Sequence, residues 1–122
     1  MMRGILLGAA AFAMLAAPAF AQDRCSSPLA PVVPDGKTAT VAQLSQAAKE
    51  VVAFIKASDD YQTCLLAAIA EQDKLSKDPK NPPDPAIKKA LEAKGDANQK
   101  EKERIGGDYN RSAAAYKAAH PK

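Results

Sequence analysis

The sequence predicts an all-α protein: a long helical hairpin with an extended proline-rich N-terminal segment stapled to the first helix by one disulfide. Three observations carry this prediction. From residue 37 to residue 78 there is no proline or glycine, and apolar residues recur every three or four positions, as on one face of a helix. Several prolines then end this helical pattern, and a second stretch of helix-forming residues follows them. The chain also holds two cysteines, at positions 25 and 64.

The first 21 residues have the pattern of a secretory signal peptide. Arg3 precedes an uncharged run over residues 4–17, and small residues flank Phe20. This order predicts cleavage between Ala21 and Gln22. The apolar run is short for a membrane span of about 20 residues, and no basic stop-transfer cluster follows it. We therefore expect a periplasmic or secreted chain with no stable membrane anchor after signal cleavage.

Composition limits the remaining 101 residues (122 − 21) to a single domain over residues 22–122. The formal net charge of +3 falls to +2 when Arg3 is removed (3 − 1), and acidic and basic residues are interspersed. Such a weak, mixed charge argues against nucleic acid as a partner. The chain has no tryptophan and is rich in alanine and lysine, which favours helices around a thin core.

Residues 22–39 are expected to form an extended segment that ends in a turn. Pro28, Pro31 and Pro34 recur at three-residue spacing. Proline fixes φ and has no backbone N–H, so this spacing favours a polyproline-like conformation. The sequence Pro34-Asp35-Gly36 is a turn signal, because proline presets φ and glycine accepts positive φ.

The first helix is expected over residues 40–76. Thr40 and Gln43 fit a capping box, in which each side chain covers a free backbone N–H of the first turn. The spacing of the apolar residues defines one helical face, interrupted once at Ser58. That face consists of Leu44, Ala47, Val51, Phe54, Tyr61, Leu65, Ala68 and Leu75.

A proline-rich loop over residues 77–84 ends the first helix, because these prolines cannot lie inside it. Asp84 and Pro85 suit the N-cap and first position of a second helix over residues 85–119. Its inner face is expected to carry Ile87, Leu91, Ile105, Tyr109, Ala113 and Tyr116.

The middle of the second helix is polar, since Lys94, Asn98 and Glu101 fall where the apolar face should continue. Gly106 and Gly107 each weaken the helix by roughly 1 kcal/mol relative to alanine. A kink or a break near residue 106 is therefore the alternative to a continuous helix.

Cys25 and Cys64 are expected to form a disulfide, because an exported chain with two cysteines usually pairs them. In a lipoprotein the cysteine directly follows the cleavage point, whereas Cys25 lies further along the chain. Cys25 is also not part of a C-x-x-C-H haem motif. Unlinked thiols or a bridge between two chains is the alternative to this pairing.

The lengths of the two connecting segments agree with the pairing. The 24 residues from Thr40 to Cys64 span about 36 Å of helix. The 12 residues from Cys25 to Lys37 span about 37 Å of polyproline-like chain. A segment that doubles back would place Cys25 beside Cys64 and three apolar residues against the helix flank of Val41, Ala53 and Ala57. These three are Leu29, Val32 and Val33.

Short motifs follow one another in a distinctive order. A cysteine after an export signal is followed by the P-D-G turn, by V-x-x-F at 51–54 and Y-x-x-C-L at 61–65, and by Y-N-x5-Y-K at 109–117. This order resembles small exported helical proteins of proteobacteria that are uncharacterised as a group. The resemblance implies an envelope location and a helical hairpin, and it brings no catalytic or binding residues to this chain.

The sequence offers no set of catalytic, cofactor-binding or metal-binding residues. His120 is the third residue from the C-terminus, where chains usually fray. The chain has neither a nucleophile-elbow serine nor a glycine-rich phosphate loop. Two cysteines and one histidine are too few for a soft-metal site. We therefore expect a protein that is not an enzyme and needs no cofactor.

Two functions are compatible with these observations. The first is an interaction module of the cell envelope, which pairs with itself as a homodimer or with an envelope protein partner, because so small a chain buries little core alone. Its candidate interaction patch is Val52 and Ile55, to one side of the helix face that carries Phe54. The alternative is a periplasmic carrier of a small apolar or aromatic ligand. Its binding site would lie near Phe54, Tyr61, Tyr109 and Tyr116.

Overall fold

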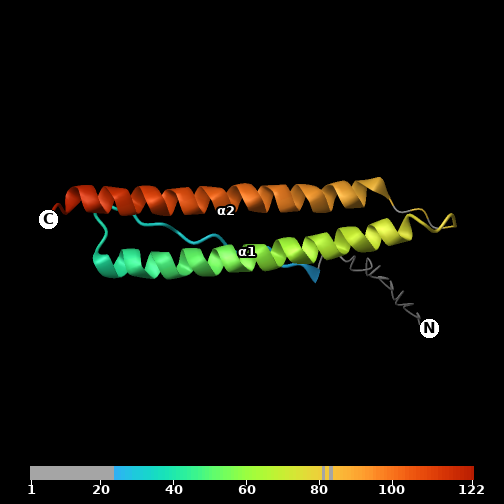
Figure 1. The fold of residues 1–122 in the computed structure, drawn as a ribbon, viewed down its shortest axis with the longest axis horizontal. Coiled ribbons are helices and arrows are strands. Elements are labelled where there is room, and N and C mark those ends of the chain that lie inside the picture. Colours follow the sequence, from blue (N-terminus) through green and yellow to red (C-terminus); the bar gives the residue numbers. More distant parts are fainter. Residues whose placement is uncertain (1–23, 81, 83) are drawn as a thin grey trace, which may run out of the picture.

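The computed structural model describes residues 24–80, 82 and 84–122. Two helices of equal length, α1 (Val41–Leu75) and α2 (Pro85–Ala119), run antiparallel to each other as a hairpin (Figure 1). The predicted signal peptide and its predicted cleavage position after Ala21 lie outside the described residues. The expected fold class, an all-α helical hairpin with a stapled N-terminal segment, is confirmed.

The capping chemistry expected from the sequence is present at both helix starts. The Thr40 hydroxyl accepts a hydrogen bond from the Gln43 backbone N–H at 3.1 Å, and the Gln43 side chain accepts one from the Thr40 N–H at 2.9 Å. The Asp84 carboxylate accepts from the Ala86 N–H at 2.9 Å, with Pro85 in the first turn. Each cap satisfies backbone donors that have no partner inside the helix.

The helix α2 is continuous through Gly106 and Gly107, so the chain is not broken at this point. Arg104 forms an ion pair with Asp108 at 3.0 Å that spans both glycines, and Asp108 pairs in turn with Arg111. Pairs at this spacing add about 0.2–0.5 kcal/mol each. Ile105, buried beside the glycines, adds the packing that supplies most helical stability in proteins.

The two helices meet along a seam with a seven-residue repeat. Buried residues of α1 alternate spacings of three and four, and those of α2 recur every seventh position. This is the repeat of a coiled-coil seam. The α2 positions are Leu91, Asn98, Ile105 and Ser112.

A polar layer divides the core into two apolar clusters. The side chains of Ser58 and Asn98 are both buried, and the Asn98 amide donates to the Ser58 hydroxyl at 3.2 Å. The loop-end cluster lies on the side of the interhelical loop and consists of Tyr61, Leu65, Ala68 and Leu91. The turn-end cluster lies on the other side and consists of Val51, Phe54 and Ile105. Ser58 and Asn98, the polar residues that interrupt the two apolar faces, therefore form one hydrogen-bonded pair.

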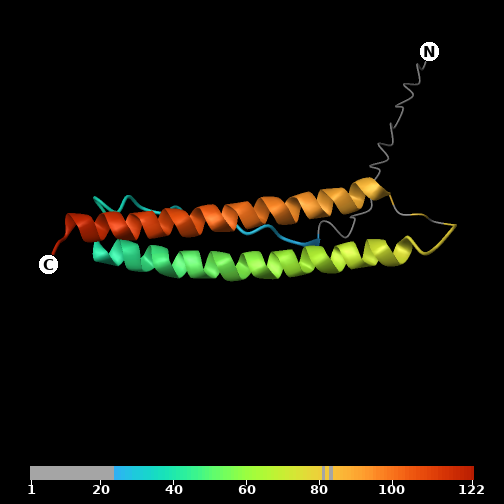
Figure 2. The same cartoon turned by 45° about the horizontal axis from the view of Figure 1, so that its top comes forward.

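Residues 25–36, here called the strap, run along the hairpin and contact both helices (Figure 2). The Ser112 hydroxyl of α2 donates to the Pro34 carbonyl. Gly36 is buried so close to α2 that a Cβ there would lie 1.8 Å from the Ser112 carbonyl oxygen. Glycine is therefore required at the point where the turn crosses the helix.

The expected packing of the strap is only partly correct. Val33 packs against the turn-end cluster, but Leu29 is 94 % exposed and Val32 is 88 % exposed. An extended chain of three residues per turn can direct only some of its side chains inward. Here the three prolines and Val33 are half-buried, and Leu29 and Val32 lie on the outer side.

Candidate interaction surface

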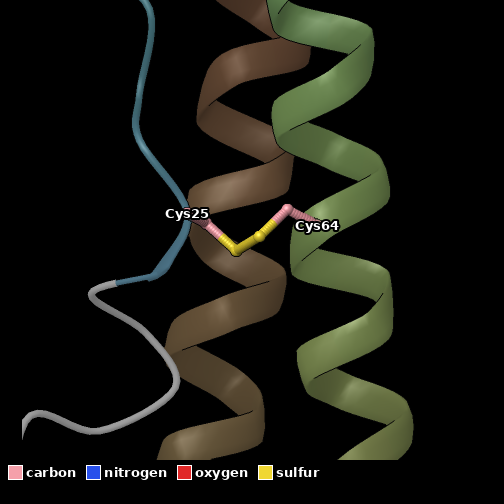
Figure 3. The surroundings of a disulfide bond; sticks show 2 residues. All are labelled: Cys25 and Cys64. Atoms are coloured by element: carbon pink, nitrogen blue, oxygen red, sulfur yellow. A yellow bond between two sulfur atoms is a disulfide. The ribbon is translucent and has the colours of Figure 1, made fainter.

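The disulfide between Cys25 and Cys64 fixes one end of the strap to α1 (Figure 3). The two Cα atoms lie 5.7 Å apart, inside the range that a disulfide spans without moving the backbone. Cys25 also packs against the loop-end cluster. The bridge, the buried Gly36 and the Ser112 hydrogen bond together hold the strap over one side of the hairpin.

The opposite side of the hairpin has no such cover within the described residues. The strap lines one depression together with α1 residues such as Gln46 and Ala47, and another together with α2 residues such as Arg104 and Ser112. A depression of about 290 Å³ with no strap residue lies between Leu66 and Ile69 of α1 and Gly95 of α2. We call this side the uncovered face. Its α1 residues, spaced alternately by four and three, are Ala48, Val52, Ile55, Asp59, Gln62, Leu66, Ile69 and Asp73.

The predicted interaction patch lies on this uncovered face. Val52 is 67 % exposed, whereas Ile55 is half-buried and packs against the turn-end cluster. Val52 thus offers a free apolar surface, and Ile55 links that surface to the core.

A second apolar pair on the same face escaped the sequence reasoning. Leu66 is 66 % exposed, and half-buried Ile69 packs against the loop-end cluster. This pair repeats the arrangement of Val52 and Ile55 fourteen residues later. The seven-residue repeat of α1 was the signal that could have found it.

Polar contacts between the helices separate the two apolar pairs. Lys102 of α2 pairs with Asp59 at 2.6 Å. The Gln62 amide donates to the side-chain oxygens of Asn98 at 2.8 Å and of Gln99 at 3.1 Å. The centre of the uncovered face is therefore a fixed polar band between two apolar areas.

Exposed ion pairs complete the electrostatics of the hairpin. A hydrogen bond to Asp73 raises the pKa of Lys88, and a hydrogen bond from Arg104 lowers the pKa of Glu101. Because the pKa of Glu101 is lowered in the folded state, its contribution to folding stability is lost as the pH falls through that pKa. These groups are solvent-exposed, so such pairs contribute little to stability and are screened by salt.

The four aromatic rings proposed for a ligand carrier do not meet at one place. Phe54 and Tyr109 belong to the turn-end cluster and its surroundings, whereas Tyr61 belongs to the loop-end cluster. Tyr116 stacks on His120 with ring centroids 4.2 Å apart. Phe54 and Tyr61 are buried and act as core residues. The carrier function stays a prediction.

A depression of about 680 Å³ lies between the strap and α2 among the described residues. Arg104 and Arg111 line it, and each already pairs with a carboxylate of α2. The two guanidinium groups are therefore engaged within the helix rather than directed at a ligand.

Within residues 24–80, 82 and 84–122, no three side chains of His, Cys, Asp or Glu are grouped as metal ligands. In that part of the chain, neither helix combines the length and apolarity that crossing a membrane requires. Searches against protein-family models, curated proteins and solved structures find no match to this chain.

Proposed function

We propose that this protein is an exported, non-enzymatic interaction module of the cell envelope that binds a protein partner through the uncovered face. One observation carries the proposal. The side chains of Val52 and Leu66 are two-thirds exposed on a face that the strap leaves open, and exposed apolar clusters commonly mark interaction sites.

The construction of the hairpin supports this use of the face. Ile55 and Ile69 connect the exposed side chains to the two core clusters, so the apolar surface is held on a rigid element. Rigid positioning lowers the entropy lost when a partner binds. The strap and its disulfide keep the other side of the hairpin occupied, which leaves one face for the partner.

Export is part of the same proposal. The disulfide is typical of oxidising compartments such as the periplasm. The pattern of residues 1–21 and the resemblance to small exported proteobacterial proteins point to the same location.

We expect export to remove residues 1–21. The protein recovered from the periplasm should have the intact mass of a chain that begins at Gln22, with its N-terminal glutamine free or cyclised. Mass spectrometry of the periplasmic fraction checks this result. A membrane-bound chain that retains Met1 would contradict the export proposal.

We expect a photo-crosslinking amino acid at position 52 to form a protein adduct in the native cell envelope. The matched control is the same amino acid at position 32, because Val32 is also apolar and highly exposed but lies on the strap. Gel electrophoresis and mass spectrometry identify the adducts. Equal labelling at the two positions, or none at position 52, would remove the support for the uncovered face.

A further inference from the structure

We propose that the partner on the uncovered face is a second copy of this chain, with the α1 helices of the two copies packed antiparallel across a two-fold axis. This inference rests on the proposed function and names the partner. The axis passes between Asp59 and Gln62, at the middle of the face.

The order of side chains along α1 carries the proposal. From the midpoint, one direction reads Asp59, Ile55, Val52, and the other reads Gln62, Leu66, Ile69. Each direction gives one polar and then two apolar residues, at the same spacings of four and three. A two-fold interface packs one surface against the same surface of the other copy. A helix that pairs antiparallel with its own copy therefore needs the same order of polar and apolar side chains in both directions from the axis.

The register follows from this symmetry. Ile55 of one copy lies opposite Leu66 of the other, and Val52 lies opposite Ile69. Each of these pairs joins one half-buried side chain to one that is two-thirds exposed. Asp59 lies opposite Gln62 of the other copy near the axis, and both side chains keep their contacts with α2 of their own copy.

The area of the face matches what a stable dimer needs. Residues 48–73 span about 39 Å of helix, and two adjacent helices are about 20 Å wide. The face therefore has a projected area of about 780 Å² per copy over both helices, which is of the same order as the roughly 800 Å² of accessible surface that each partner buries in a standard interface.

Gly95 gives independent support from α2. A Cβ at this position would make only an ordinary contact, 3.8 Å from the Leu65 Cδ1 atom, so the packing of the hairpin itself does not require glycine. Gly95 lies between Leu91 and Asn98, whose partners on α1 are Leu65 and Ser58. It is therefore level with the midpoint, where two α2 helices of a dimer approach and a missing side chain lets backbones come close.

A charge exchange tests both the partner and the register. We expect the oxidised wild type recovered from the periplasm to show twice the chain mass by sedimentation equilibrium. Ile55→Lys alone and Leu66→Glu alone should each give monomers. The two single variants mixed, or both substitutions in one chain, should restore the doubled mass, because the introduced lysine then faces the introduced glutamate of the other copy. A charged substitution on the strap, Val32→Glu, is the matched control and should leave the mass doubled.

Distances between spin labels provide a second measurement that does not alter the apolar residues. Labels attached at position 49 and then at position 56 lie outside the seam on exposed residues. In the antiparallel register their axial separation between copies should fall by about 21 Å, since each label moves seven residues toward the axis. A parallel pairing, or α1 packed on α2 of the other copy, would leave the separation unchanged and overturn the register.

A wild type that stays monomeric at every concentration overturns self-pairing. If the crosslinker at position 52 still captures a different protein, the proposed function stands without this inference. If position 52 captures nothing, both fall. A dimer whose single variants are not rescued by charge exchange also contradicts the arrangement proposed here.

Discussion

Replacing both cysteines with serine is expected to lower the free energy of unfolding by about 4 kcal/mol. The bridge joins residues 39 apart in sequence. In the chain-entropy model, a cross-link stabilises the fold by restricting the unfolded chain, and the effect grows with the length of the closed loop. Because small domains have a net stability of only about 5–15 kcal/mol, the loss is a large share of the total. Denaturant unfolding followed by circular dichroism measures it.

Reduction of the wild-type disulfide is the matched control for this double variant. A reducing agent should destabilise the wild type by a similar amount and leave the Cys25→Ser, Cys64→Ser chain unaffected. Free thiols detected in the unfolded, unreduced wild type would contradict the bridge itself.

Leu91→Ala is expected to lower the free energy of unfolding by about 2–5 kcal/mol. Leu91 is 1 % exposed and belongs to the loop-end cluster. The substitution removes buried methyl groups and leaves a cavity that rigid helices fill only in part. Thermal and denaturant unfolding measure the change.

Leu29→Ala is the matched control, since it removes the same atoms from a leucine that is 94 % exposed on the strap. Its effect should lie within about 0.5 kcal/mol of zero, as for surface substitutions without special contacts. Similar losses for the two variants would mean that the loop-end cluster is not the core of the fold.

Local chemistry made the helix limits predictable from the sequence. The expected helices over 40–76 and 85–119 agree with Val41–Leu75 and Pro85–Ala119 once Thr40 and Ser76 are counted as caps. Capping boxes, N-terminal prolines and proline-rich loops act over a few neighbouring residues. The disulfide was predictable for a different reason: the lengths of the two segments that it joins are fixed by backbone geometry.

Interactions between distant residues could not be predicted in the same way. Ser58 and Asn98 each interrupt an apolar pattern, and only the packing of α1 on α2 shows that they hydrogen-bond to each other. The strap was expected on α1 alone, whereas Ser112 and Gly36 attach it to α2 as well. Of the candidate interaction surface, the sequence predicted only Val52 and Ile55, because their position beside the core face follows from helical periodicity. The same periodicity places Leu66 and Ile69 on that flank, but only the structure shows that the strap leaves this flank open.

The hydrogen bonds of the hairpin also imply an order of folding. Lys88 and Asp73 are 15 residues apart, Asn98 and Ser58 are 40 apart, and Ser112 and Pro34 are 78 apart. Closing a longer loop costs more chain entropy, so we expect contacts near the interhelical loop to form first and helix pairing to proceed outward from it. The contact of the strap with α2, which spans the longest loop, is expected to form last. The disulfide connects the strap to α1 alone, so its closure does not require α2 to be in place.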